Sequence, residues 1–506
     1  MGLLQNLAIG FSAFANPVVI LYTIVGVVSG VVIGALPGLG PSTGIAVLLP
    51  LTYGMDPVAG IAMLAGIYYG AMYGGSITAI LINTPGDSAA VMTTLDGYPL
   101  AKKGKAAHAM GMAAYASIIG GTFGVIVFMF LAPTIAKMAL AFGPSEYFAL
   151  MVLGLTSIAG MTGKSSFKGF FAALTGLFIS TIGIDLVLGT PRFSFGNIYL
   201  WGGVDFIPVA MGLFGIAEII STKDNGEQIR IGRDELKFRN MFPAWSEWRE
   251  CLPHIARGSV LGFFVGVLPG AGATIASFLS YDVAKRTSRR RSEFGTGVLE
   301  GVAAPESANN AASMGAMLPM LTLGVPGSGA TAIMMGALLM FGMTPGPFLF
   351  TKEPEFAWGL VASMYAGNLV LLILVICALP LFVQILKVKA PILNAVVMGF
   401  IIIGAYALEN SMYGVIIALV FGAIGYFFKK LEVSPAPLVL GIVLGSITEK
   451  NLRQAMTIFK GDVGKMLTRP ITMVFLAIAV LFIFGEPIKK HIISMIARRK
   501  SARGEE

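Results

Sequence analysis

The chain has 506 residues, of which 56% are hydrophobic and only 12% are charged, and its mean hydropathy is +0.82. This is more apolar surface than a water-soluble domain of that size can bury, so the composition excludes a soluble globular protein and places the chain in a bilayer. The net charge of +9 does not indicate nucleic-acid binding, because the basic residues fall between apolar runs and near the C-terminus instead of forming a stripe.

The chain begins with a short segment, residues 1–16, that lacks the charged start and the small-residue cleavage site of a signal peptide. We expect this segment to form an interfacial helix, with no cleaved part and no lipid anchor. From Pro17 almost to the end, apolar runs recur, and about 12 of them reach the ~20 residues needed to cross a bilayer. They show no strand alternation, and open sheet edges are not satisfied in lipid. The predicted fold is therefore an all-α polytopic membrane protein.

The first interruption of the apolar pattern is GALPGLGPST, residues 34–43, which contains Pro37, Gly38 and Gly40. Proline lacks a backbone N–H and glycine adopts conformations that other residues avoid, so a helix should break here. A break is tolerated in a membrane where it lines a polar cavity, and the N–H groups that open the next half-helix suit a carboxylate. Thr43 adds a hydroxyl just past the break. Close helix packing is the alternative explanation, but it accounts for the proline poorly.

A second interruption follows in NTPGDS, where the acidic side chain of Asp87 stands in an apolar region. Ionisable residues at such depth are costly and usually functional. Together with Asn83, Thr84, Gly86 and Ser88, the carboxylate predicts a site for a small hard cation or a proton. The alternative is that Asp87 simply caps the following half-helix.

Both interruptions recur later in the chain, in the same order, which indicates two related halves. Ser328 stands where Asp87 does, so we expect one half to serve the coupling ion and the other mainly the substrate. The first interruption recurs 232 residues later (269 − 37), at Pro269, Gly270 and Gly272, with the hydroxyl of Thr274 nearby. The second recurs 241 residues later (326 − 85), at Pro326, Gly327 and Ser328. The predicted divisions are an N-terminal helix (1–16), a first half (17–220), a hydrophilic connecting segment (221–252), a second half (253–450), and a C-terminal span with a basic tail (451–506).

The basic residues predict how the two halves are oriented. In the first half they follow the second interruption, and in the second half they follow the first, so equivalent loops should lie on opposite sides of the membrane. This pattern is typical of inverted repeats with broken or re-entrant helices, which are characteristic of secondary transporters. The residues concerned are Lys102, Lys103 and Lys105, and then Lys285, Arg286, Arg289, Arg290 and Arg291.

A polar string in the second half, APESANNAASMG (residues 304–315), runs into an apolar helix. Its Pro-Glu-Ser start resembles a helix N-terminus, so we expect Glu306 to lie at a positive dipole end. Asn309 and Asn310 are adjacent amides on different faces of one helix, and each needs partners. We expect at least one of them to line the cavity.

The remaining chemistry-bearing residues indicate neither an enzyme nor a tightly bound metal. Cys251 and Cys377 suggest no disulfide framework, and the three histidines are scattered near loop ends. No P-loop, zinc-protease or nucleophile-elbow motif occurs, so we expect no catalysis and no cofactor beyond a coupling Na⁺ or H⁺. The basic tail places the C-terminus in the cytoplasm.

Four motifs in order resemble the large membrane subunit of the tripartite tricarboxylate transporters, the TctA family. They are GALPGLGPSTGIAVLLPLTYG, INTPGDSAAVMTTLDGYPLAKKGKAAHA, APESANNAASMGAMLPMLTLGVPGSGATA and GMTPGPFLF. The resemblance implies a multi-pass permease of the bacterial inner membrane that takes up citrate or related di- and tricarboxylates, driven by a sodium or proton gradient. It also implies a small TctB-like membrane subunit and a periplasmic TctC-like binding protein as partners.

Transferred to this sequence, the resemblance places one site between the two halves at the four interruptions. The family usually has glutamate where this chain has Asp87, so the acid is kept but shortened. Transport would follow alternating access, with an elevator-like movement favoured. The alternative function is a passive anion channel, which would share the broken helices but need no coupling ion.

Overall fold

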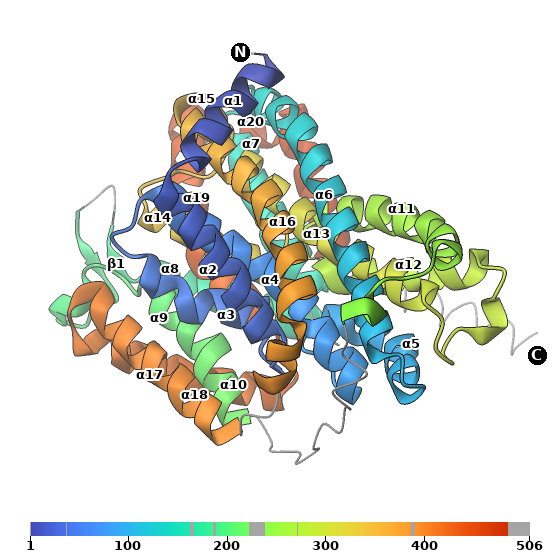
Figure 1. The fold of residues 1–506 in the computed structure, drawn as a ribbon. Coiled ribbons are helices and arrows are strands. Elements are labelled where there is room, and N and C mark those ends of the chain that lie inside the picture. The colour runs from blue at the N-terminus through green and yellow to red at the C-terminus, as the bar shows by residue number, and fades with distance from the viewer. Residues whose placement is uncertain are drawn as a thin grey trace, which may run out of the picture. The chain divides into compact units, whose positions relative to one another are not determined.

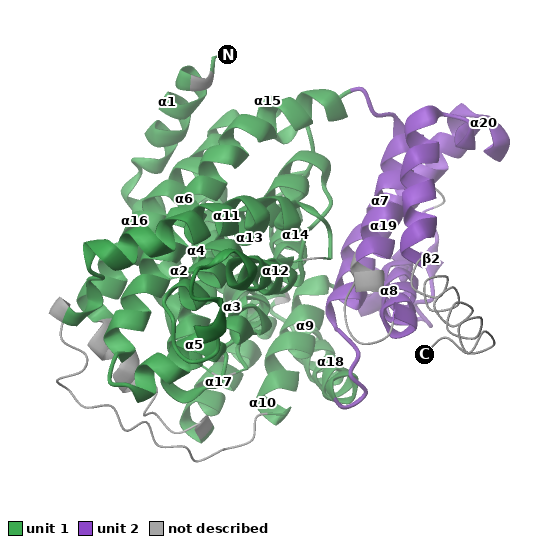
Figure 2. Cartoon of the chain, turned by 90° about the vertical axis from the view of Figure 1, so that its right-hand side faces the viewer, with its two compact units in different colours: residues 1–140, 205–429 green, residues 141–204, 430–506 purple. Residues whose placement is uncertain are grey.

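The structure is a computed structural model that describes residues 2–36, 38–161, 166–185, 189–221, 238–270, 272–385 and 390–483. The described chain is almost wholly helical, as the sequence predicts (Figure 1). It divides into two compact units (Figure 2). Unit 1 comprises Met1–Leu140 and Asp205–Lys429, and unit 2 comprises Ala141–Val204 and Lys430–Glu506. All four interruptions fall within the residues of unit 1, so the units do not coincide with the two halves.

In the first part of unit 1, three helices, α2, α3 and α4, begin with proline. There the missing N–H costs nothing, because it would have no partner in the helix. Asn16 caps α2 by accepting the N–H of Val18 at 3.0 Å, and Asp56 caps α4 by accepting that of Val58 at 3.0 Å. The elements are α1 (Leu3–Phe14), α2 (Pro17–Gly34), α3 (Pro41–Leu48), η1 (Leu49–Thr52), α4 (Pro57–Ile82), η2 (Ser88–Ala90), α5 (Val91–Lys102) and α6 (Ala106–Ala139).

The second part of unit 1 repeats this order of a long helix, a break and a short helix. Its α13 begins at Glu300, so the helix start expected around Glu306 is wrong, and that residue lies in the helix interior. The elements are α9 (Phe206–Ala210), η4 (Met211–Ile216), α10 (Ala217–Ser221), η5 (Phe238–Met241), α11 (Trp245–Val267), α12 (Gly272–Thr287), η6 (Arg291–Glu293), α13 (Glu300–Leu323), α14 (Gly329–Met340), α15 (Leu349–Lys352), α16 (Pro354–Ile385), α17 (Ala390–Glu409) and α18 (Met412–Lys430).

Glycine lets two pairs of helices pack at backbone distance, α2 on α4 and α11 on α13. A Cβ placed on Gly30 would lie 2.6 Å from the carbonyl oxygen of Ile67, and one on Gly262 would lie 2.2 Å from that of Ala308. The two contacts are related by the same offsets as the interruptions, 232 (262 − 30) and 241 (308 − 67). The same relation holds one turn to either side, for Gly26 on Met63 with Gly258 on Ala304, and for Gly34 on Ala71 with Gly266 on Ala312.

Two of the interruptions form the tips of helical hairpins. Helices α11 and α12 lie side by side (Figure 1), and Arg257 in the middle of α11 donates a hydrogen bond to Thr287 at the end of α12. Helix α3 turns back on α2 in the same way, with Gly44 packed against Ile33. The tips fall near residues 38–40 and 269–270. The second arm of each hairpin therefore runs back toward the end at which its first arm begins.

The loops at the ends of these helices meet in two groups. At one end, Lys103 after α5 donates to the carbonyl of Thr296 in the α12–α13 loop at 2.8 Å. At the other end, Gly60 near the start of α4 packs against Phe341 after α14. The two basic loops of the sequence therefore lie together, while Figure 1 shows α5 and α15 at opposite ends of the view.

Six helices among the described residues are long and apolar enough to cross a membrane, so the predicted 12 spans are not confirmed. Several apolar runs that have the composition of spans are instead hairpin arms or halves of broken helices. The six segments are Pro17–Gly34, Pro57–Ile82, Ala106–Ala139, Pro354–Ala378, Pro391–Leu408 and Met412–Lys430.

Unit 2 contains a small antiparallel hairpin that the sequence did not suggest, and charged residues hold this hairpin. Asp185 is 2% exposed and binds Arg192 at 3.2 Å and Arg453 at 2.8 Å, which links the hairpin to α19. The elements are α7 (Pro144–Met161), α8 (Ser166–Ser180), β1 (Gly183–Ile184), β2 (Pro191–Arg192), η3 (Ile198–Leu200), α19 (Ala436–Ile458), α20 (Val463–Leu467) and the apolar helix Pro470–Ile483. The predicted basic tail after residue 483 lies outside the described residues.

Candidate functional site

Two hydrogen bonds link the halves at the interruptions: one joins an interruption of each half, and the other joins an interruption to the middle of α4. Ser88, just after the second interruption of the first half, lies with its Oγ 2.7 Å from Oγ1 of Thr274, just after the first interruption of the second half. Tyr68 on α4 lies with its hydroxyl 3.1 Å from Oγ of Ser328, at the second interruption of the second half. Residues 88 and 274 therefore bring an interruption from the first part of the sequence into contact with one from the second.

Within each half, the two interruptions also lie side by side. A Cβ placed on Gly40 would be 3.3 Å from the Cβ of Asp87. The N–H of Gly270 donates to the carbonyl oxygen of Gly327 at 3.1 Å. All four interruptions thus form one group, which we call the break cluster: Gly40, Tyr68, Asp87, Ser88, Gly270, Thr274, Gly327 and Ser328.

The second interruption of each half has the same backbone geometry. Helix α4 ends at Asn83 with φ of 56°, and α13 ends at Gly324 with φ of 71°, both left-handed. After the turn, Asp87 Oδ1 accepts the N–H of Ala90 at 3.1 Å, and Ser328 Oγ accepts an N–H three residues on, at 3.3 Å. The capping function considered for Asp87 is therefore present, and it leaves the carboxylate only half-buried. The neighbouring Asn83 and Ser88 are exposed and Thr84 is half-buried, so these side chains are accessible beside the carboxylate.

Gly86 and Gly327 hold these interruptions against the helices of their own half. A Cβ on Gly86 would lie 2.0 Å from the carbonyl oxygen of Gly34 and 2.6 Å from the Cα of Gly75. One on Gly327 would lie 2.9 Å from the Cα of Ala316. Only glycine fits, because the clashing atoms are backbone atoms that cannot move away.

The first interruptions differ from the second in how their half-helices start. Pro37 lies outside the described residues, whereas Gly38 and Gly270 take left-handed φ angles of 84° and 83° that require glycine. Helix α3 begins after Gly40 with no side-chain cap, so its first N–H groups are not used by a side chain. The hydroxyl of Thr43 donates to the carbonyl of Phe214 at 3.3 Å and is thus engaged. In the second half, Gly272 begins α12 with φ of 60°, and Pro269 is half-buried before it.

A charged pair lies at the tip of the first hairpin, and sequence reasoning missed it. A Cβ on Gly38 would lie 2.5 Å from Oε1 of Glu218 on α10, and that oxygen lies 2.7 Å from Nζ of Lys429 on α18. Nothing in the sequence around Glu218 indicates a partner 211 residues further along the chain. The pair sets a carboxylate and an ammonium beside the exposed Gly38.

The polar string of the second half surrounds Glu306. Asn309 donates to Oε2 of Glu306 at 3.4 Å, and Asn310 donates to the Glu306 carbonyl oxygen at 3.2 Å. Thr93 on α5 and Ser117 on α6 also donate to the carboxylate, Ser117 at 3.3 Å. All of these side chains are fully buried, so the two asparagines line a closed polar centre and not an exposed cavity.

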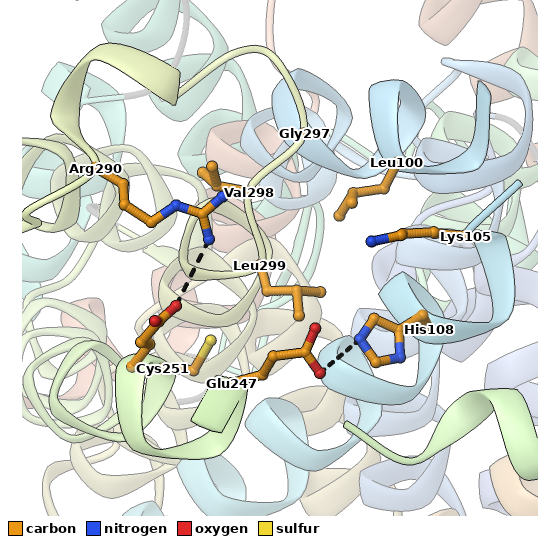
Figure 3. Close-up of a pocket in the computed structure, with 10 residues that line it drawn as sticks. Leu100, Lys105, His108, Glu247, Cys251, Arg290, Gly297, Val298 and Leu299 are labelled. Atoms are coloured by element: carbon orange, nitrogen blue, oxygen red, sulfur yellow. Dashed lines mark hydrogen bonds and ion pairs between the residues drawn. The ribbon is translucent and has the colours of Figure 1, made fainter. Parts of the chain in front are cut away.

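A separate cavity of about 60 Å³ lies where the two basic loops meet α11. Figure 3 shows His108 turned toward Glu247, with Nε2 and Oε2 separated by 2.9 Å, and Arg290 lies 3.6 Å from Glu250. Burial disfavours ionisation of Glu247, but the N–H of Ala244 and the ring of His108 bind its carboxylate and hold its pKa below the usual range. The cavity contains no predicted site residue, and its charges are largely paired with one another.

Cysteine and metal chemistry contribute nothing to the break cluster in the described part of the chain. Cys251 is buried and Cys377 is exposed, and both are free thiols. Within the described ranges, no three histidine, cysteine, aspartate or glutamate side chains lie close enough together to hold a metal ion.

Comparison with known proteins follows the same motifs. The model of the "Tripartite tricarboxylate transporter TctA family" matches residues 20–440. An Agrobacterium vitis protein, described as an uncharacterized 52.8 kDa protein in the TAR-I ttuC' 3' region, is 41% identical over 478 residues, which are 94% of this chain and 95% of that protein. A second from the same organism, described as an uncharacterized protein in the TAR-II ttuC' 3' region, is 42% identical over 220 residues, which are 44% of this chain and 91% of that protein. No solved structure matches the chain.

Proposed function

Because the chain belongs to the tripartite tricarboxylate transporter TctA family, we propose that it carries a carboxylate across the membrane by ion-coupled uptake. The substrate is a di- or tricarboxylate such as citrate, or a related organic acid, and a sodium or proton gradient drives its entry. A periplasmic TctC-like protein delivers the substrate, and a small TctB-like subunit completes the assembly in the bacterial inner membrane. The chain itself performs no catalysis.

The observation that carries this proposal is the break cluster. Broken helices expose polar backbone groups, and such groups are tolerated at membrane depth only where protein or a water-filled cavity surrounds them. Here the interruptions of both halves are joined directly by Ser88 with Thr274 at 2.7 Å, and α4 of the first half contacts an interruption of the second through Tyr68 and Ser328 at 3.1 Å. Secondary transporters place their substrate between repeats at such broken helices.

An inverted repeat is supported by the packing of each half. Gly30 on Ile67 and Gly262 on Ala308 are the same contact at the two sequence offsets. The loop of Lys103 contacts the α12–α13 loop, while the start of α4 contacts the end of α14. The hairpin α2–α3 and the hairpin α11–α12 therefore enter from opposite ends, and basic loops at one end suit the cytoplasmic side.

The substrate and the coupling ion would occupy different parts of the break cluster. An anionic substrate suits the start of α3 after Gly40, where no side-chain cap uses the N–H groups and the helix dipole is positive. The hydroxyls of Thr274 and Ser328 would contribute further donors. A coupling cation suits the half-buried carboxylate of Asp87, beside the exposed Asn83. We infer elevator-like alternating access, in which the hairpins and broken helices carry both across together.

The test is uptake of radiolabelled di- and tricarboxylates into inverted and right-side-out vesicles with imposed sodium or proton gradients and binding protein supplied. We expect accumulation above equilibrium that the Asp87→Asn variant abolishes at unchanged expression. Full uptake in that variant would remove Asp87 from the mechanism. Uptake that persists without gradients and never accumulates substrate would instead establish a passive anion channel.

A further inference from the structure

Glu306 is a buried carboxylate in the middle of α13, and it is enclosed by four helices. Its side chain is 0% exposed. Thr93 on α5, Ser117 on α6 and Asn309 on α13 all donate hydrogen bonds to its two oxygens, those from Ser117 and Asn309 at 3.3 and 3.4 Å. These donors are neutral, so they satisfy the oxygens without supplying a positive charge.

No cation compensates this carboxylate within the described part of the chain, where no lysine, arginine or histidine forms an ion pair with it. Asp87 and Tyr73 are the titratable groups that sense its charge, and Asp87 is of like sign. Asp96, one turn beyond Thr93, is occupied by the hydroxyl of Tyr281 at 2.8 Å and by loop N–H groups. The other titratable or charged side chains on the surrounding elements are Tyr68 and Tyr69 on α4, Tyr98 and Lys102 on α5, His108, Tyr115 and Lys137 on α6, Glu247, Arg249, Glu250, Cys251, His254 and Arg257 on α11, and Glu300 on α13.

A further hydroxyl lies beside this carboxylate and suits either charge state. Ser76 on α4 is fully buried beside Glu306, and its Oγ lies outside the geometry of a full hydrogen bond. A hydroxyl can either donate or accept. It would donate to an ionised Glu306 and accept the O–H of a protonated one, so both charge states have a partner already in place.

From this arrangement we propose that Glu306 is the group that binds and releases the transported proton. The inference rests on the proposed ion-coupled transport. It makes the proton the coupling ion and Glu306 its carrier, in place of the cation site considered at Asp87, and it leaves Asp87 as the neighbouring carboxylate whose charge opposes ionisation of Glu306. A proton from the outer solution adds to the carboxylate and gives the neutral acid, and the same O–H bond breaks when the site faces the inner solution. Neutralising the acid removes its repulsion with Asp87. The surrounding helices can then move without carrying an unpaired charge through the membrane.

The contacts favour a proton over sodium at this position. Sodium needs several oxygen acceptors directed at one point, as hard cations do. Around Glu306 the hydroxyls of Thr93 and Ser117 and the amide of Asn309 are turned the other way, as donors to the carboxylate. A proton needs only one oxygen and one acceptor, and Ser76 supplies the acceptor.

The transport experiment uses the full chain with its partner subunits in proteoliposomes whose membrane potential is clamped at zero. The probe is the radiolabelled carboxylate that the wild type accumulates best. An inward gradient of one pH unit supports about tenfold accumulation for each proton carried. We expect Glu306→Gln to lose this accumulation while retaining exchange of labelled for unlabelled substrate, which needs no net proton movement. Glu300→Gln, on the same helix, is the matched control and should accumulate normally.

Infrared spectroscopy of the purified chain provides a readout that is independent of substrate. A difference spectrum between about pH 8 and about pH 6 leaves out the surface carboxyls, which titrate near pH 4. Its protonated-carboxyl carbonyl band should be lost in Glu306→Gln but present in Glu300→Gln. Accumulation driven by the pH gradient in Glu306→Gln would overturn the inference, as would accumulation driven by sodium alone. Loss of exchange as well as accumulation would also overturn it, because that result indicates a structural role. If the wild type transports no carboxylate at all, the proposed function fails, and the infrared result still decides whether Glu306 takes up a proton.

Discussion

Replacing Gly86 by alanine tests the close packing on which the break cluster depends. The added Cβ would lie 2.0 Å from the carbonyl oxygen of Gly34 and 2.6 Å from the Cα of Gly75, both backbone atoms. Because neither can rotate away, the second interruption must shift, and overpacking of this kind costs about 1–3 kcal/mol or more. The φ of Gly86 is not left-handed, so the effect is steric only. Gly399 is the matched control site, because it is a helical glycine at which an added Cβ would meet nothing within 4 Å.

The assay is thermal unfolding of the detergent-solubilised chain, followed by fluorescence-detected size exclusion, together with vesicle uptake. We expect Gly86→Ala to lower the unfolding midpoint by several degrees and to abolish uptake. Gly399→Ala should be neutral or slightly stabilising, since alanine is favoured over glycine in a helix by about 1 kcal/mol. Equal midpoints for Gly86→Ala and the wild type, with normal uptake, would refute the packing described for this interruption.

Three further outcomes follow from the contacts. Tyr68→Phe should reduce uptake by up to about tenfold, since a neutral hydrogen bond contributes about 0.5–1.5 kcal/mol. Ser328→Ala should lose at least as much, because Ser328 Oγ also accepts the N–H of Thr331. A double variant that falls below Ser328→Ala by the full Tyr68→Phe loss would contradict a shared bond. Asp96→Ala should lower the free energy of unfolding by about 3 kcal/mol or more, because three loop N–H groups lose their acceptor, and an unchanged thermal midpoint would disprove this. Because the folded-state pKa of Glu247 is depressed, its contribution to stability is present at neutral pH and is lost progressively as the pH falls below about 4.3. Glu247→Gln should therefore weaken the fall of the unfolding midpoint on acidification to about pH 3, and an unchanged pH profile would contradict this.

The interruptions were predictable because their signals are local. Proline and glycine act on the backbone wherever they occur, so the breaks at Gly38, Gly86, Gly270 and Gly327 could be placed from the sequence, and their left-handed or close-packed geometry follows from the residue type. The equivalence of the two halves was likewise visible in the spacing. The number of spans was not, because an apolar run has the same composition whether it crosses the membrane or turns back as a hairpin arm.

The polar centre was predicted less well, because its partners come from distant segments. Glu306 looked like a residue at a helix start since Pro305 precedes it, but α13 begins at Glu300 and encloses the carboxylate. Its donors, Thr93 and Ser117, lie in the other half of the chain, and nothing in their local sequence distinguishes them from ordinary hydroxyls. Tertiary packing decides such contacts, and a single sequence does not record it.

Cross-linking of Ser88→Cys with Thr274→Cys, in a chain whose native cysteines are replaced, tests most directly whether the interruptions of the two halves form one transport site. The native hydroxyls lie 2.7 Å apart, a separation that suits a disulfide between the substituted thiols. We expect oxidation to join the pair by a disulfide and to stop uptake of labelled carboxylate. Reduction of the disulfide should restore uptake. Two thiols that remain independently reactive under oxidation, or a cross-linked protein that transports at the full rate, would contradict it.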